Sequence, residues 1–283
     1  MIAKVADIVF SVSINRPIEL IHIEETYRDF YSTEKPDVTI HAHYNGIPQL
    51  NLRDTDGFFD SEVIWRLFHT NGNNIIVMRL PSDSRPYRIA IFDSDFRRGE
   101  VYSHDRLTDG GLPNPLEFPL SEVLMVCLLA KYRGLMVHAC GIDDRGQGYL
   151  FAGNSTHGKT TMARLWKDYA NILNDDRIVI RKKGDHFWMY GTPWHGEYTG
   201  VSPQGVPIEK IFFLNHAEKN SVKKYNGASV ASMLLARSFP PLWDAEGMKF
   251  TLDFCAQLVD IVPCYKLNFV PDENIVDFVR CVK

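Results

Sequence analysis

One octapeptide in the middle of the chain has the residue types and spacing of a phosphate-binding loop. Residues 153–160, Gly-Asn-Ser-Thr-His-Gly-Lys-Thr, match the pattern G-x-x-x-x-G-K-[ST]. The two glycines allow a tight turn whose backbone N–H groups point inward at phosphate oxygens. Lys159 can then reach the β- and γ-phosphates, and the Thr160 hydroxyl can hold Mg²⁺. The motif therefore predicts a site for ATP with Mg²⁺.

We assign the predicted nucleotide contacts to the whole loop and to the residue that follows it. Within the loop, Ser155 could line the γ-phosphate site. His157 occupies a variable position of the motif, so its side chain is expected to face solvent. The predicted contacts are Gly153, Asn154, Ser155, Thr156, His157, Gly158, Lys159, Thr160 and Thr161.

The segments around the loop are the elements that must position it. Residues 148–152, Gly-Tyr-Leu-Phe-Ala, predict a buried strand, and residues 161–166 predict a helix. The positive end of that helix would face the phosphates. Residues 135–142 predict another strand, and the polar turn after it makes the two strands a hairpin. The loop therefore follows the second arm of a predicted hairpin.

Candidate acid–base and metal residues lie on either side of the loop. His138 lies on the first arm of the hairpin, and Asp175 and Asp176 follow a short apolar strand predicted at 170–174. Adjacent carboxylates repel each other, and a divalent ion would stabilise them. A solvated turn is the alternative interpretation of the two aspartates. An exposed or internally hydrogen-bonded side chain is the alternative for His138.

Five further residues could contribute to a site. His195 and Glu197, in an aromatic and polar turn, could contact the phosphoryl acceptor or the metal. Arg237 is a candidate phosphate clamp, and an arginine on the surface of a helix is the alternative. His41 and His43 lie two residues apart on one face of a predicted strand, a spacing that could suit a metal. No third ligand has a matching spacing, which favours a solvated strand face.

The composition indicates a soluble globular protein. Hydrophobic residues make up 45% of the 283 residues and charged residues 23%, and the formal net charge of −4 argues against general binding to nucleic acid or a membrane surface. Neither a signal peptide nor a membrane-length apolar run is evident. Five scattered cysteines without a C-x-x-C pair are typical of a reducing compartment. We therefore expect a cytoplasmic protein, and a homo-oligomer is compatible with the sequence.

Two regions are expected along the chain. Alternating strands at 8–14 and 38–44, with an Asn71-Gly72 hairpin signal, make the first hundred residues β-rich. A segment rich in Gly and Pro at 108–119 suggests a boundary. We therefore predict a β-rich N-terminal region at 1–115 and a phosphate-loop core at 116–283, giving a mixed α/β fold.

Further elements are expected within the predicted core. A helix over 120–132 has Ser121 as its N-cap. The hairpin 177–190 follows the aspartates. Other predicted elements are a buried strand at 210–214, helices at 228–237 and 244–259, a strand at 264–267 and a helix at 273–281.

The order of a hairpin-borne His138, the phosphate loop and Asp175-Asp176 resembles the catalytic core of HPr kinase/phosphorylase. It is also similar to the wider group of serine kinases of that type, including those that modify peptide precursors. Phosphoenolpyruvate carboxykinase has a related core. The resemblance covers about residues 120–214, and the segment 191–196 looks like a turn of the peptide-kinase subgroup. The chain departs from the family at Thr161, where the family often has Glu, and the N-terminal half does not resemble the regulatory domain of the HPr enzyme.

The resemblance implies a carboxykinase-like phosphate-loop fold and transfer of the γ-phosphoryl group of ATP to a hydroxyl, with serine of a protein or peptide as the favoured acceptor. By resemblance, Asp175 is the base beside His138, and Asp176 binds the metal with Thr160. The residues themselves leave open which aspartate has which role. The alternatives are a nucleotide-binding regulatory or scaffold protein without transfer activity, a small-molecule kinase and, less favoured, a carboxykinase.

Overall fold

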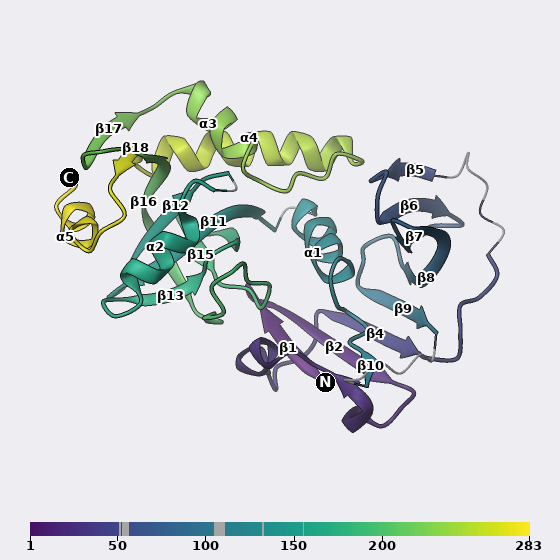
Figure 1. Ribbon diagram of the computed structural model, residues 1–283. Helices are drawn as coiled ribbons and strands as arrows, with labels where there is room; N and C mark the ends of the chain where they lie inside the picture. The colour runs from purple at the N-terminus through teal and green to yellow at the C-terminus, as the bar shows by residue number, and fades with distance from the viewer. Residues whose placement is uncertain (51, 53–56, 105–110, 132, 155) are drawn as a thin grey trace. The chain divides into compact units, whose positions relative to one another are not determined.

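The computed structural model describes residues 1–50, 52, 57–104, 111–131, 133–154 and 156–283. The chain divides into two compact units, Met1–Leu128 and Leu129–Lys283 (Figure 1). Large sheets and a few helices make up the two units, so the predicted mixed α/β class is confirmed. The division falls inside helix α1 (Leu120–Ala130). A boundary at 115/116 remains a prediction, and residues 108–110 of the Gly/Pro-rich segment lie outside the described residues.

The N-terminal unit contains an eight-stranded sheet in the order β1-β2-β4-β9-β8-β7-β6-β5. The pairs β2–β4 and β4–β9 are parallel, and the other neighbours are antiparallel. The strands are β1 (Ile2–Val5), β2 (Ile8–Ile14), β4 (Val38–His43), β5 (Gly57–Asp60), β6 (Trp65–Thr70), β7 (Asn73–Leu80), β8 (Asp83–Phe92) and β9 (Arg98–Ser103). A separate parallel pair joins β3 (Ile21–His22) to β10 (Leu112–Pro113), and 3-10 turns span Ile18–Leu20 and Glu25–Phe30.

Local sequence signals explain much of this sheet. The predicted strands at 8–14 and 38–44 are β2 and β4. Asn71 and Gly72 have φ values of +53° and +76°, so they form the tight turn between β6 and β7 with both residues left-handed. The hairpin predicted from the Asn-Gly pair is therefore confirmed.

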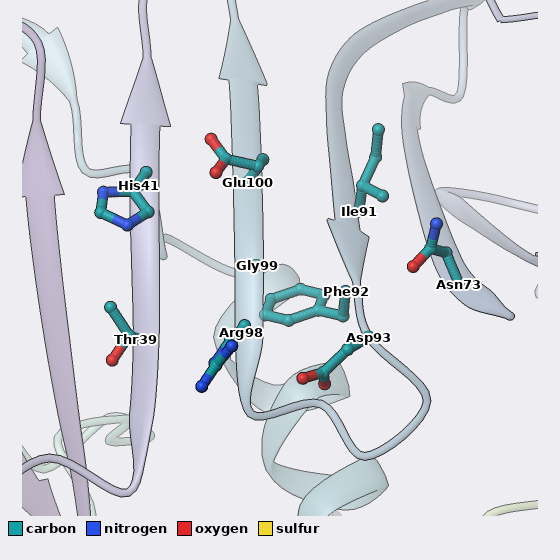
Figure 2. A pocket seen from close by; sticks show the side chains of 9 residues that line it. All are labelled: Thr39, His41, Asn73, Ile91, Phe92, Asp93, Arg98, Gly99 and Glu100. Carbon is teal, nitrogen blue, oxygen red and sulfur yellow. The ribbon is translucent and has the colours of Figure 1, made fainter.

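The two histidines of β4 belong to a polar strand face. His41 Nδ1 lies 2.5 Å from Ser13 Oγ, and His43 Nε2 lies 2.5 Å from Glu100 Oε2. His41 is one of the residues that line a pocket of about 440 Å³. Figure 2 shows the Phe92 ring of the same pocket beside Gly99. Among the described residues, no group of three or more His, Cys, Asp or Glu side chains could hold a metal ion. His41 is exposed and His43 is half-buried, so this strand face is partly solvated.

The described residues of the C-terminal unit form eight strands and four further helices. The strands are β11 (Leu135–Asp144), β12 (Gln147–Ala152), β13 (Asn171–Asn174), β14 (Arg177–Lys183), β15 (His186–Tyr190), β16 (Gly205–His216), β17 (Ser221–Tyr225) and β18 (Cys264–Phe269). The helices are α2 (Lys159–Trp166), α3 (Ala228–Leu235), α4 (Ala245–Ile261) and α5 (Asn274–Arg280). The predicted hairpin, buried strand and helices therefore all occur, with ends shifted by a few residues.

Two long strands, β11 and β16, each change partners along their length. Residues 135–138 of β11 pair with β14, and residues 139–144 pair with β12. Similarly, β16 pairs first with β15 and then, in parallel, with β12 and β18. The pairings β12-β11-β14-β15-β16 return to β12 and close a ring. This ring fixes the hairpin arm that carries His138 beside the end of β12.

The strand that precedes the phosphate loop is buried on both faces. Leu150 and Ala152 of β12 pack in a cluster with residues of α3 and α4. Tyr149 and Phe151 pack in a second cluster with residues of α2 and α5, including the fully buried Trp166. Burying each large apolar side chain contributes about 1.5–3 kcal/mol. The apolar run at 149–152 is thus explained by helices on both sides of the strand (Figure 1).

Helix ends differ in detail from the prediction. Ser121 lies inside α1 rather than at its N-cap, and its Oγ has no hydrogen-bond partner among the described residues. Tyr132, the predicted end of that helix, lies outside the described residues. Asp244 does cap α4, because its side chain accepts a hydrogen bond from Gly247 N at 3.0 Å. No helix in the described part of the chain is long and apolar enough to cross a membrane.

Candidate active site

The phosphate-loop motif joins β12 to α2, as its sequence context predicts. Gly158 is the residue before the helix and has a left-handed φ of +95°. A Cβ atom on Gly158 would lie 2.5 Å from Phe269 Cζ and 3.1 Å from His216 Cε1. Both the backbone conformation and the lack of space therefore require glycine here. The loop lies at the N-terminus of α2, where backbone N–H groups and the helix dipole favour an anion.

Lys159 lies in the interior of the site rather than on the surface. It is 6% exposed, and its Nζ donates a hydrogen bond to the carbonyl oxygen of Asn154 at 3.0 Å. Burial lowers the pKa of Lys159, and the nearby carboxylates of Asp176 and Asp175 oppose this shift. The lysine charge thus lies between the loop and the two aspartates.

The loop backbone is strained at Thr156. Its φ of +70° is unusual for a β-branched residue, and such conformations cost about 1–3 kcal/mol. His216 at the end of β16 contacts the strained residue, with Nε2 3.1 Å from the Thr156 carbonyl oxygen. Ser155, the neighbouring predicted contact, lies outside the described residues. Strain of this kind is often found in ligand-binding loops.

Thr160 and Asp175 form the first of two polar pairs. The Thr160 hydroxyl donates to Asp175 Oδ2 at 2.8 Å. Asp175 is only 1% exposed, and it also accepts hydrogen bonds from the backbone N–H groups of Gly196 at 2.7 Å and Tyr198 at 3.2 Å. Because Thr160 gives its proton to Asp175, its oxygen lone pairs are available for a cation.

His138 and Asp176 form the second pair. His138 Nε2 lies 2.6 Å from Asp176 Oδ1, and Arg177 Nη1 contacts the other carboxylate oxygen. Burial raises the pKa of Asp176, but the hydrogen bond from His138 and the charges of Arg177, His138 and Lys159 outweigh it, so the net pKa is lowered. Asp176 is therefore ionised at neutral pH.

The strand register brings the second pair together. His138 on β11 lies opposite Arg177 on β14, and Ala139 N donates to the Asp176 carbonyl oxygen at 3.3 Å. The buried Asn174 shapes the turn between β13 and β14. Its Oδ1 accepts hydrogen bonds from Asp176 N at 2.6 Å and Arg177 N at 2.8 Å. A histidine and a carboxylate 38 residues apart in sequence, 176 − 138, thus come into contact.

Four residues that contact the two aspartates were not predicted from the sequence, namely Asn174, Arg177, Gly196 and Tyr198. The backbone donors of Gly196 and Tyr198 have no side-chain signature in the sequence. The role of Asn174 could have been predicted, because asparagine side chains in turns often accept hydrogen bonds from backbone N–H groups two residues further along the chain.

Among the described residues, no hydrogen bond links the side chain of His195 or Glu197 to either aspartate. His195 Nδ1 lies 2.8 Å from the Gly196 carbonyl oxygen. The Glu197 side chain is 81% exposed and lies 3.7 Å from Arg164 Nη2. Their predicted contacts with an acceptor or metal therefore stay predictions.

The expectation that His157 faces solvent holds only in part. The residue is half-buried, and its Nδ1 is buried without a hydrogen-bond partner among the described residues. The lack of a side chain on Gly153 makes room for it, since a Cβ atom there would lie 2.9 Å from His157 Cβ. Burial lowers the pKa of His157, and the charges of Arg237, Lys159 and His216 lower it further, so the imidazole is neutral at neutral pH.

Arg237 lies near the loop and not on an exposed helix surface. It follows α3, is half-buried, and its guanidinium group lies 5.4 Å from the centre of the Phe213 ring. Its Nη1 donates to the Met233 carbonyl oxygen at 2.7 Å, while its buried Nε has no partner in the described part of the chain. The positive charge of Arg237 lowers the pKa of His157, so Arg237 is close enough to contribute to the electrostatic potential at the loop.

Gly196→Ala is expected to disturb the Thr160–Asp175 pair. A Cβ atom on Gly196 would lie 2.9 and 3.0 Å from the two carboxylate oxygens of Asp175. The carboxylate must then move away from Thr160, so we expect Mg²⁺-dependent ATP affinity to fall roughly tenfold, about 1.4 kcal/mol. Calorimetric titration with ATP, with and without Mg²⁺, measures this effect.

Gly146→Ala is the matched control, because Gly146 has a φ of +87° and open space around its Cβ position in the β11–β12 turn. It should lower stability without changing the dependence on Mg²⁺. An unchanged Mg²⁺ dependence in Gly196→Ala would contradict the prediction.

Comparison with known proteins adds little to this geometry. No protein-family model matches the chain, and no curated protein matches it. Among solved structures, the Hpr(Ser) kinase/phosphatase from Coxiella burnetii is similar over 51% of this chain and 85% of that chain, with 11% sequence identity and a TM-score of 0.32. A similarity this weak decides neither family nor activity, so the family resemblance remains a prediction.

Proposed function

We propose that this protein is an ATP-dependent kinase that transfers the γ-phosphoryl group to a hydroxyl, with serine of a protein or peptide as the favoured acceptor. One observation carries the proposal. Two adjacent aspartates are directed to different partners, Asp175 to the phosphate-loop residue Thr160 and Asp176 to His138. Phosphoryl transfer needs a metal-binding side and a side that orients the nucleophile, and the two pairs supply them.

The donor side consists of the loop and its lysine. The loop N–H groups and Lys159 bind the β- and γ-phosphates of ATP. The Thr160 hydroxyl and the Asp175 carboxylate are hard oxygen donors of the kind that Mg²⁺ prefers, and such sites need only one or two protein ligands beside phosphate and water. When bound, Mg²⁺ neutralises charge on the phosphate oxygens. Arg237 supports the same charge from beside the loop.

The acceptor side consists of Asp176 and His138. Asp175 is buried and already accepts three hydrogen bonds, whereas the Asp176 side chain is 22% exposed. We therefore assign the aspartates in the opposite sense to the family-based expectation, with Asp175 on the metal side and Asp176 on the acceptor side. The lowered pKa of Asp176 makes it a weak base by itself, and it serves chiefly to orient His138.

The transfer step follows from this arrangement. The Asp176–His138 pair removes the proton of the acceptor hydroxyl as its oxygen forms a bond to the γ-phosphorus. The bond between the γ-phosphorus and the bridging oxygen breaks, and ADP leaves with that oxygen. The products are a phosphate ester and ADP, and the proton resides on the Asp176–His138 pair until it reaches solvent.

Incubation with γ-labelled ATP, Mg²⁺, serine-containing peptides and small-molecule alcohols tests the proposal. We expect Mg²⁺-dependent label on serine. If only the small alcohols carry label, the acceptor is a small molecule and not a protein or peptide. Tight ATP binding with neither transfer nor hydrolysis would indicate a regulatory or scaffold protein instead.

A further inference from the structure

The two sides of the phosphate loop face different parts of the sheet. The strands around the loop lie in the order β13-β11-β12-β16-β18, and β12 leads into the loop. Thr160 is hydrogen-bonded to Asp175, which follows β13, so the reacting end of a bound nucleotide lies on that side. Its base must then project the other way, over the carboxyl ends of the parallel strands β16 and β18.

An exposed ring lies at that place. His216 is the last residue of β16, and its Nε2 is 3.1 Å from the carbonyl oxygen of Thr156 in the loop. Its ring packs on that of the fully buried Phe269, the last residue of β18, with centroids 4.9 Å apart and an interplanar angle of 36°. Both rings lie against Gly158, whose missing side chain leaves them room. The imidazole is therefore held at the loop while the residue remains exposed.

We propose that His216, supported by Phe269, is the surface on which the nucleobase of the bound nucleoside triphosphate stacks. This inference rests on the proposed function, because the position of the base follows from the orientation of the phosphates. Histidine rings are among the side chains on which bases stack, and such stacking contributes about tenfold or more to affinity. The hydrogen bond to Thr156 couples this surface to the strained part of the loop.

Two substitutions separate the ring from the hydrogen bond. His216→Gln keeps a nitrogen donor near the position of Nε2 and removes the ring, while His216→Phe keeps the ring and removes the donor. Affinities for Mg²⁺-ATP and for Mg²⁺-tripolyphosphate, which lacks a base, are measured by calorimetry. We expect His216→Gln to lower ATP affinity roughly tenfold with tripolyphosphate affinity unchanged. His216→Phe should keep the wild-type ratio of the two affinities.

The result that overturns this inference alone is an unchanged ratio in His216→Gln, with both ligands still binding. If the wild-type protein binds neither ligand, the proposed function fails and this inference fails with it. Thermal unfolding of each variant confirms that the affinities refer to folded protein.

Discussion

Asp176→Asn is expected to lower the rate of phosphoryl transfer by about 10²–10⁴-fold and to leave ATP affinity within about threefold of wild type. The substitution removes the carboxylate that holds His138 Nε2 at 2.6 Å, while the Thr160–Asp175 pair on the donor side stays in place. The imidazole then loses the partner that fixes its orientation and stabilises its positive charge. Single-turnover transfer assays and calorimetric titration measure the two effects separately.

Asp175→Asn is the comparison on the donor side, at the neighbouring aspartate, which has other partners and is more deeply buried. It should weaken Mg²⁺-dependent ATP binding, since an amide bonds the Thr160 hydroxyl less strongly than a carboxylate does. His138→Asn should resemble Asp176→Asn, and the double variant should lose little more, because the two side chains act as a unit. The opposite result would be that Asp175→Asn loses transfer with intact ATP binding, while Asp176→Asn keeps transfer. That result would restore the assignment of Asp175 as the base.

Lys159→Ala is expected to reduce ATP affinity by about 30- to 1,000-fold, or roughly 2–4 kcal/mol. Lys159 is 6% exposed and lies beside the two aspartates, so nucleotide phosphates would meet a desolvated positive charge there. Removing it leaves the phosphates near the two carboxylates, with Mg²⁺ and Arg237 as the remaining positive charges on the proposed donor side. Calorimetric titration with Mg²⁺-ATP provides the measurement.

Lys167→Ala is the control for this variant, because Lys167 is an exposed lysine directly after the last residue of the same helix. It should bind ATP as the wild-type protein does. Wild-type ATP affinity in folded Lys159→Ala would rule out the phosphate-loop interpretation of residues 153–160.

Structural features that depend on residues close together in the sequence were predicted well. The strand, loop and helix around Gly153–Thr160 follow from local patterns, because glycine positions, apolar runs and the loop's lysine and threonine act over a few residues. The Asn71-Gly72 turn was found for the same reason, since it needs left-handed backbone at two adjacent positions. By contrast, β17 escaped prediction because its residues Ser-Val-Lys-Lys-Tyr are largely exposed at a sheet edge and show no apolar alternation.

Local sequence patterns are enough to place the phosphate-loop motif between a buried strand and a helix, and to select His138, Asp175 and Asp176 as its candidate partners. The tertiary structure sets which aspartate meets which partner, because adjacent residues point in different directions and their contacts depend on strand register and on the Asn174 turn. It also decided that His157 is half-buried and that His216 lies against the loop. These contacts join residues distant in the chain, and only the packing of strands and helices around β12 brings such residues together.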